Sequence, residues 1–153
     1  MFDLKSDLNL CNRLEVASGL AVSGNTAGKQ GSWVNFSDGS IGTATSGKGA
    51  FMVWSESNRD NSFGWTPDVN DTGKLTVLAG HYIGYTTEFN EASAGDITVG
   101  ELLVVAANGK LEQATVAADD TDNQATAVAV CLEAAADHKY VGGTYSSIKI
   151  MSL

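Results

Sequence analysis

Apolar and polar positions along the chain follow the short period of β-strands, and two stretches, 31–56 and 100–133, repeat one pattern. Each begins with an apolar run, passes a turn signal, continues as a short strand ending in Ala-Thr, and reaches another apolar run that closes on Glu. The turn signals are Asp38-Gly39 and Asn108-Gly109, pairs that favour tight hairpins because the turn needs positive φ at its central residues. The pattern therefore predicts a β-hairpin plus a third strand, built twice.

The clearest single strand covers 75–89. Fifteen residues at roughly 3.3 Å each would extend about 50 Å, which is too long for an unbent strand, so we expect a bend at Gly80 or Gly84. Alternate positions form one mostly apolar face, which also carries a histidine that we expect to be hydrogen-bonded and partly buried. That face comprises Leu75, Val77, Ala79, His81, Ile83, Tyr85, Thr87 and Phe89.

Residues 1–30 are expected to form an N-terminal arm and flexible connector ahead of a β domain at 31–153. The connector part, 18–30, is rich in Gly, Ser, Ala and Thr. The arm contains two leucine pairs four residues apart, which favour a short amphipathic helix, although an extended arm fits nearly as well. These pairs are Leu4 with Leu8 and Leu10 with Leu14.

A long polar loop at 58–73 carries Phe63 and Trp65. Loops of this length in compact domains are usually functional or form interfaces. Two alternatives stay open: the two rings fill the core of their own domain, or they contact another subunit. Further strands are expected at 125–132 and around Ile148, and no segment shows sustained helical periodicity. The sequence therefore predicts an all-β fold made of two similar hairpin units.

Composition agrees with short strands and tight turns, because the 153 residues include 17 glycines and one proline. Only 18% of residues are charged, below the usual quarter, so we expect a partner or further copies of the chain to cover part of the surface. The net charge of −9 falls within Glu88–Asp137, which holds ten acidic residues and one base, Lys110. This stretch is either a solvated face or one that docks on a basic partner, and direct nucleic-acid binding is disfavoured.

No apolar run is long enough to span a membrane, and Met1–Leu8 has acidic residues where a signal peptide carries bases. Cys11 and Cys131 form no disulfide framework. We therefore expect two reduced thiols in a protein that is made in a cytoplasm and does not contact a membrane.

Residues 42–49 come close to a phosphate-binding loop. Gly49 stands where that motif needs Ser or Thr for Mg²⁺, and a strand-like run follows instead of a helix. Residues 119–123 (Asp119 to Asn123) offer oxygen ligands but lack the Gly and terminal Glu of a helix–loop–helix calcium site, so whether they bind a cation stays open. Neither segment predicts a cofactor or a metal.

The remaining candidates for chemistry are equally weak. His81 and His138 do not have a metal-ligand spacing. Cys131 lies on a strand face with Ala127 and Ala129, an apolar setting that argues against an activated thiolate. Because no Gly-x-Ser-x-Gly nucleophile elbow is present either, the sequence predicts no catalytic residue.

The run ITVGELLVVAANGKLEQAT at 97–115, followed by the strand-like 125–130, resembles the small β-rich decoration (cement) proteins on the heads of tailed bacteriophages. The earlier segment, with Trp33, the Asp-Gly turn signal, 51–54 and 75–81, is similar to the longer members of that family. The likeness extends from about Gly31 to the C-terminus.

This resemblance implies a β-tulip or a small β-barrel or sandwich, no enzymatic activity and no cofactor. It implies a virion protein on the outer capsid surface, made in the host bacterial cytoplasm, that bridges neighbouring subunits of the major capsid protein. It further implies assembly as a homotrimer or, next, a dimer, with an N-terminal arm that reaches a neighbour. The residues expected to contact the capsid or another subunit are Phe2, Leu4, Leu8, Leu10, Leu14, Phe63, Trp65 and Tyr82.

Two other function classes stay open. The chain could be a tail-tube or head-completion subunit of a virion. It could also be a ligand-binding β module for a glycan or peptide, with Trp33, Trp54 and Trp65 as a stacking platform.

Overall fold

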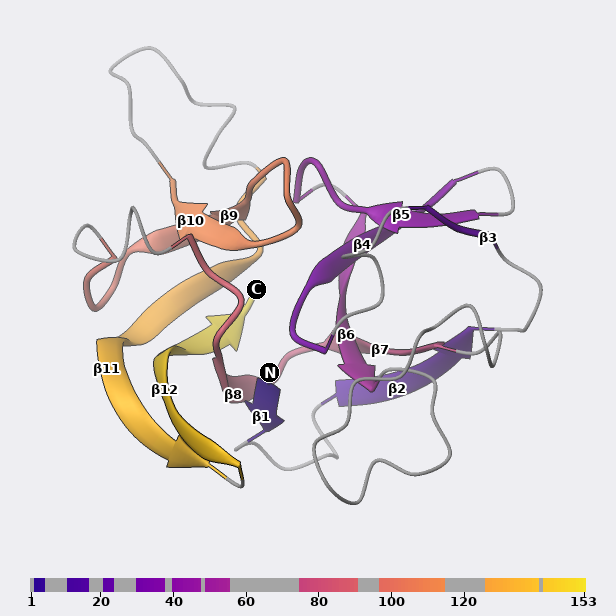
Figure 1. Cartoon of the computed structure of the whole chain (residues 1–153). Helices are drawn as coiled ribbons and strands as arrows, with labels where there is room; N and C mark the ends of the chain where they lie inside the picture. Colours follow the sequence, from indigo (N-terminus) through magenta and orange to yellow (C-terminus); the bar gives the residue numbers. More distant parts are fainter. Residues whose placement is uncertain are drawn as a thin grey trace, which may run out of the picture.

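The computed structural model is all-β, as the sequence predicts, and its strands form two sheets that pack together without closing into a barrel (Figure 1). It describes residues 2–4, 11–16, 21–23, 30–37, 40–47, 49–55, 75–90, 97–114, 126–140 and 142–153. These residues form no helix, and so none that could cross a membrane. Predicted features at Phe63, Trp65 and residues 119–123 lie outside the described residues.

Each sheet has six strands. In order across the first sheet these are β1 (Phe2–Leu4), β8 (Ile83–Thr86), β12 (Gly143–Ser152), β11 (Ala129–Tyr140), β9 (Leu102–Val105) and β10 (Leu111–Gln113). In order across the second they are β2 (Cys11–Val16), β7 (Leu75–Gly80), β6 (Ala50–Ser55), β4 (Trp33–Ser37), β5 (Ser40–Thr43) and β3 (Ala21–Ser23). All strand pairs are antiparallel except β3 with β5.

The two repeated stretches of sequence take the same strand order. The first gives β5-β4-β6, and the second gives β10-β9-β11. In both, a hairpin is followed by a third strand that returns to the free side of the hairpin's first strand. The same pattern of apolar runs and turns therefore produces the same three-stranded antiparallel unit in each sheet, and the next strand along the chain, β7 or β12, pairs with its third strand.

The two hairpin turns differ in length. Ser37 pairs directly with Ser40 on either side of the Asp-Gly signal, as a two-residue connection requires. In the second hairpin the Ala106 N–H donates to the Lys110 carbonyl, which leaves three residues in the loop. The last of them, Gly109, has φ 74°, and a three-residue loop of this kind ends in a left-handed residue. The predicted hairpin is therefore present, and its loop is one residue longer than the Asn-Gly pair that signals it.

The predicted strand at 75–89 is broken where a bend was expected, at Gly80, which has φ 95°. From Tyr82 to Glu88 the buried positions are even-numbered, so the predicted face of odd-numbered residues is wrong there, whereas the odd-numbered Phe89 is buried. Before the break Val77 and Leu78 are both buried and belong to different apolar clusters. The reason is that β7 is a central strand covered on both faces, and the glycine break shifts the alternation that follows.

Parts of the N-terminal segment belong to the sheets. β1 pairs with β8, and β2 pairs with β7 along its whole length. The expected helix is therefore wrong for the described residues of 1–17, which are strands, and the extended alternative describes them better. Leu8 and Leu10 lie outside the described residues.

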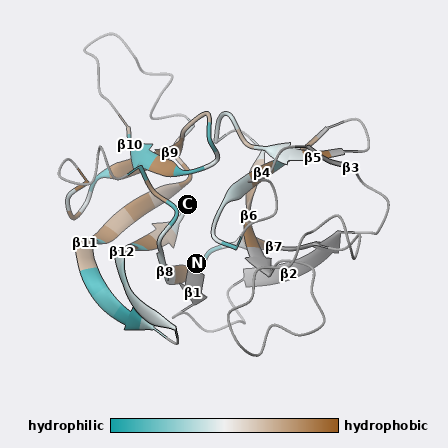
Figure 2. Ribbon diagram, in the orientation of Figure 1, coloured by the Kyte–Doolittle hydropathy of each residue, from teal (hydrophilic) through white to brown (hydrophobic). Residues whose placement is uncertain are grey.

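The main core lies between the sheets. The second sheet contributes Trp33, Met52 and Leu78, and the first contributes Leu103 and Ile148 among others. Two close backbone approaches join the first repeated stretch, 31–56, to the second, 100–133. The Trp33 N–H donates to the Gly109 carbonyl at 2.9 Å, and Gly47 lies against Thr126. Hydrophobic residues follow β9 and the first half of β11, whereas the second half of β11 is hydrophilic (Figure 2).

Candidate functional site

Among the described residues, polar and aromatic side chains gather on one face of the β11–β12 hairpin and the neighbouring β8. The register pairs Lys149 with Tyr85 on one side and with Glu133 on the other, so the three side chains form one row across the strands. The Tyr85 hydroxyl donates to Glu133 Oε2 at 2.8 Å, and Lys149 Nζ lies 5.5 Å from the centre of the Tyr85 ring. This row faces away from the core residues Cys131 and Ile150.

Two irregularities in β11 shape this face, and the first places Glu133 on it. Regular alternation would put residues two apart on the same side, Cys131 together with Glu133. The register instead shifts between these two residues, so that Cys131 opposes Ile150 while Glu133 opposes the next residue along, Lys149. A second shift follows before Ala136, and each inserts an extra residue as a β-bulge does.

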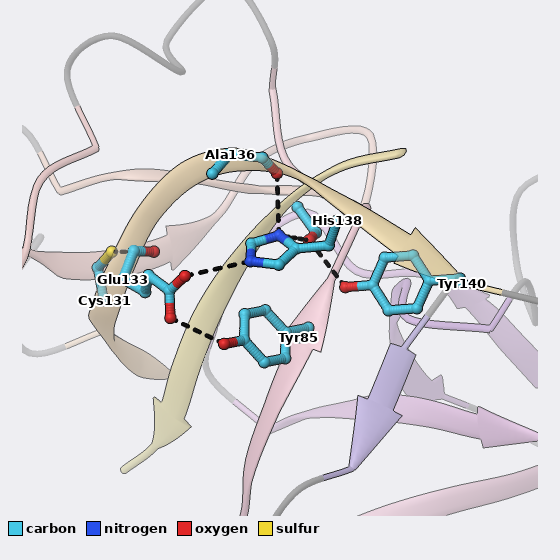
Figure 3. Close-up of polar contacts among 7 residues, drawn as sticks. Tyr85, Cys131, Glu133, Ala136, His138 and Tyr140 are labelled. Carbon is cyan, nitrogen blue, oxygen red and sulfur yellow. Dashed lines mark hydrogen bonds and ion pairs between the residues drawn. The ribbon is translucent and has the colours of Figure 1, made fainter. Parts of the chain in front are cut away.

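The second shift brings His138 onto the same face as Glu133. Five residues separate the two, which regular alternation would place on opposite faces. With the bulge, His138 Nε2 lies 3.1 Å from Glu133 Oε1 (Figure 3). His138 Nδ1 lies 2.9 Å from Ser147 Oγ and 3.0 Å from the Ala136 carbonyl oxygen, and Ser147 Oγ lies 2.8 Å from the Tyr140 hydroxyl.

The result is a continuous polar network that joins Tyr85, Glu133, His138, Ser147 and Tyr140. Its order of carboxylate, imidazole and hydroxyl matches the connectivity of a nucleophilic triad. However, Ser147 has 0% exposure, and its oxygen is already engaged by two partners. A nucleophile must reach a substrate, and the buried Ser147 hydroxyl is not placed to do so; its two contacts join β12 to β11.

Aromatic rings extend the same face toward the hairpin tip. The ring centres of Tyr85 and His138 are 4.7 Å apart, those of His138 and Tyr140 6.4 Å, and those of Tyr140 and Tyr145 6.3 Å. Tyr145 is 45% exposed. The sequence analysis considered His138 only as a possible metal ligand and did not predict this face. Its side chains come from three strands, and the bulges in β11 bring them together.

The Tyr85 hydrogen bond gives a titration prediction. It is the largest cause that holds the pKa of Glu133 below the ordinary 4.5; desolvation opposes it, and contacts with His138 and Lys149 also lower the pKa. Folding thus favours the carboxylate, and the stability that this provides is present above pH 4.5 and is lost as the pH falls through the lower folded-state pKa.

We expect Tyr85→Phe to raise the Glu133 pKa toward 4.5, measured by NMR of the side-chain carboxyl carbon. Tyr145→Phe, which removes a hydroxyl bonded to the Gly142 carbonyl, should leave the titration unchanged; an equal shift in both variants would contradict the assignment.

Of the residues considered from the sequence, His138 lies in this network, while the side chains of Cys131 and His81 do not belong to it. Cys131 is buried, and desolvation raises the pKa of its thiol, which agrees with the expected absence of an activated thiolate. His81 makes the expected hydrogen-bond contact, with Nδ1 3.3 Å from the Ser152 carbonyl oxygen, but it is exposed and not partly buried. Its face turns outward because the break at Gly80 reverses the alternation.

The candidate phosphate loop at 42–49 is an internal contact. β6 begins at Ala50, so a strand follows the loop. A Cβ built on Gly47 would lie 2.1 Å from the Thr126 carbonyl oxygen and 2.6 Å from a Val128 methyl group. The loop therefore packs against the second half of the chain, which leaves no room for a phosphate at Gly47.

A cavity of about 210 Å³ lies between the sheets. Its lining comes from β4, β6 and β7 on one side and from the segments around Val128 and Ser152 on the other. Ligand pockets usually measure about 300–1,000 Å³, so the space is small for a binding site. Trp33 lines it and is only 3% exposed, so this residue cannot belong to an exposed stacking platform.

The residues expected at an interface are only partly placed by the structure. Phe2 and Leu4 lie in β1 and Leu14 lies in β2, while Leu8, Leu10, Phe63 and Trp65 are outside the described residues. Tyr82 is 3% exposed and packs in the main core, so its expected role as an exposed contact is wrong. It is buried because the position after the Gly80 break points inward.

The described part of the chain brings no three His, Cys, Asp or Glu side chains together in a way that could hold a metal ion. No protein-family model matches the chain, and no curated protein has a significantly similar sequence.

Proposed function

We propose that this protein is a structural virion component that binds the outer surface of a tailed-phage head and stabilises it by bridging neighbouring subunits of the major capsid protein. The proposal starts from the resemblance of 97–130 to head decoration proteins. Under it, the protein acts as a homo-oligomer on the capsid and needs neither a cofactor nor a reaction.

One observation carries the choice of a binding role over a catalytic one. The only arrangement of carboxylate, imidazole and hydroxyl groups in the described residues has its hydroxyl fully buried at Ser147. Under the proposal, docking covers some of the large apolar side chains that stay on the surface. They are Phe36, Val99, Tyr145, Met151 and Leu153.

Binding to capsids tests the proposal. The purified protein should add to expanded heads that lack it but not to immature heads, and it should raise the temperature at which expanded heads release their genome. Co-sedimentation and a thermal-release assay measure the two effects, with the heat-unfolded protein as the control. Binding to neither head form would contradict the proposal.

The other virion roles are separated by electron microscopy of the free protein, because tail-tube subunits stack into rings or filaments. The glycan-binding alternative loses part of its basis with the burial of Trp33. A tryptophan fluorescence change with a sugar from a broad panel would restore it.

A further inference from the structure

The β11–β12 hairpin extends beyond the sheet to which it belongs. β9 pairs with β11 only at Ala129 and Val130, and β8 pairs with β12 only at Ile148–Met151. Beyond these contacts β11 and β12 pair with each other as far as Tyr140 and Gly143. Among the described residues, the outer edge of β11 from Ala136 onward thus has no strand beside it (Figure 1).

This edge is held in a fixed shape. A two-stranded ribbon is marginally stable by itself, but here His138 on β11 and Ser147 on β12 are joined across the ribbon, and Tyr140 joins Ser147 as well. In an antiparallel ladder alternate residues direct their N–H and C=O groups away from the partner strand. The β11 edge therefore offers a row of backbone donors and acceptors to a further strand.

The charged side chains on this edge favour pairing with a second copy of β11. Asp137 and Lys139 are exposed on the face opposite His138, and neither side chain has an ion-pair partner within the part of the chain that the structure describes. If a second copy of β11 lies antiparallel with a two-fold axis at His138, Asp137 comes opposite Lys139 of the partner subunit, and this occurs twice. On the other face, the Tyr140 ring comes opposite the small side chain of Ala136 of the partner subunit.

The alternative is that these charges protect the edge from pairing. Edges are commonly blocked by charged residues, lysine above all. Residues at 137 and 139 with the same sign would repel in this two-fold register, whereas opposite signs attract, because directly opposed cross-strand charges interact favourably only when they differ in sign. The sequence at 136–140 is therefore complementary to itself.

We propose that the β11 edge at 136–140 is a self-association surface, on which a second copy of this chain adds its own β11 antiparallel about a two-fold axis at His138. The proposal goes beyond the capsid-binding function and does not depend on it. It selects a dimer over a trimer for the free protein. Because the paired segment is short, the dimer is expected to be weak and to dissociate further at high salt.

Charge reversal tests the register. Sedimentation equilibrium up to about millimolar concentration should show a monomer–dimer equilibrium for the wild-type chain. Asp137→Lys alone and Lys139→Asp alone should each weaken the dimer by roughly tenfold or more, because each turns two attractive pairs into two repulsive ones. An equimolar mixture of the two variants should form a heterodimer as tight as the wild-type dimer, since it restores opposite charges in both pairs.

Lys110→Asp, a charge reversal in the β9–β10 loop, is the matched control and should leave the dimer unchanged. Circular dichroism of each variant checks folding, which exposed substitutions should not alter. A wild-type chain that stays monomeric or forms a trimer overturns the proposal. It is equally overturned if single reversals leave the dimer intact, or if the mixture stays monomeric. None of these results bears on capsid binding, which is measured separately on heads.

Discussion

Replacing Gly47 with alanine will destabilise the protein by about 3 kcal/mol, the upper end of the usual cost of overpacking a tight site. The added methyl group would lie 2.1 Å from the Thr126 carbonyl oxygen, and backbone in a packed contact cannot move away as a flexible side chain does. The loop before β6 would have to separate from the segment before β11, and this contact joins the two sheets. Urea unfolding followed by tryptophan fluorescence measures the loss.

Gly49→Ala is the control for this variant, two residues further along the same loop. Gly49 has φ 69°, so alanine there costs about 1 kcal/mol of backbone strain. A Cβ at that position meets nothing within 4 Å. The larger loss of stability is therefore expected for Gly47→Ala, although only Gly49 has a positive φ. Equal losses in the two variants would show that Thr126 does not contact the loop as described.

Gly109→Ala is expected to destabilise the protein by about 3 kcal/mol, because it combines strain and overpacking. Gly109 has φ 74°, and a Cβ there would lie 2.7 Å from the Thr43 methyl group and 3.0 Å from the Trp33 carbonyl oxygen. The substitution also disturbs the hydrogen bond from the Trp33 N–H to the Gly109 carbonyl. The second hairpin would thereby lose its contact with the first strand of the first hairpin.

Gly100→Ala separates the two causes. Gly100 has φ 92° and open space where its Cβ would lie, so it should lose only the backbone contribution of about 1 kcal/mol. Chemical denaturation of both variants gives the difference in free energy of unfolding. If Gly109→Ala loses no more than Gly100→Ala, backbone strain alone accounts for the loss, and the close approach to Thr43 and Trp33 contributes nothing.

Local sequence signals predicted much of the strand pattern. The Asp-Gly and Asn-Gly pairs, with apolar runs on either side, identified both hairpins and the third strand of each unit, because turn chemistry and alternation are local properties. A bend at Gly80 or Gly84 followed from strand length, and the structure places the break at Gly80. The buried face beyond that bend did not, since a single irregular residue reverses the alternation and nothing in the sequence shows how many residues the break absorbs.

The network around His138 could not be predicted for the same reason. Glu133 and His138 are five residues apart, and an uninterrupted strand would separate them onto opposite faces. Only the register shifts on β11, combined with partners from β8 and β12, bring Tyr85, Glu133 and Ser147 to the same imidazole. Bulges depend on how two strands fit together, and no short-range signal reports that fit.

The sequence alone determined that this chain is all-β and doubled, because glycine-containing turns and apolar alternation act within a few residues of each other. The tertiary structure decided that Gly47 and Gly109 lie in close contacts between distant segments, which strand faces are buried, and where the edge of β11 has no neighbouring strand. Those features arise from contacts between segments far apart in the chain, such as Gly47 with Thr126 and Trp33 with Gly109, whose meeting is fixed only when the two sheets pack.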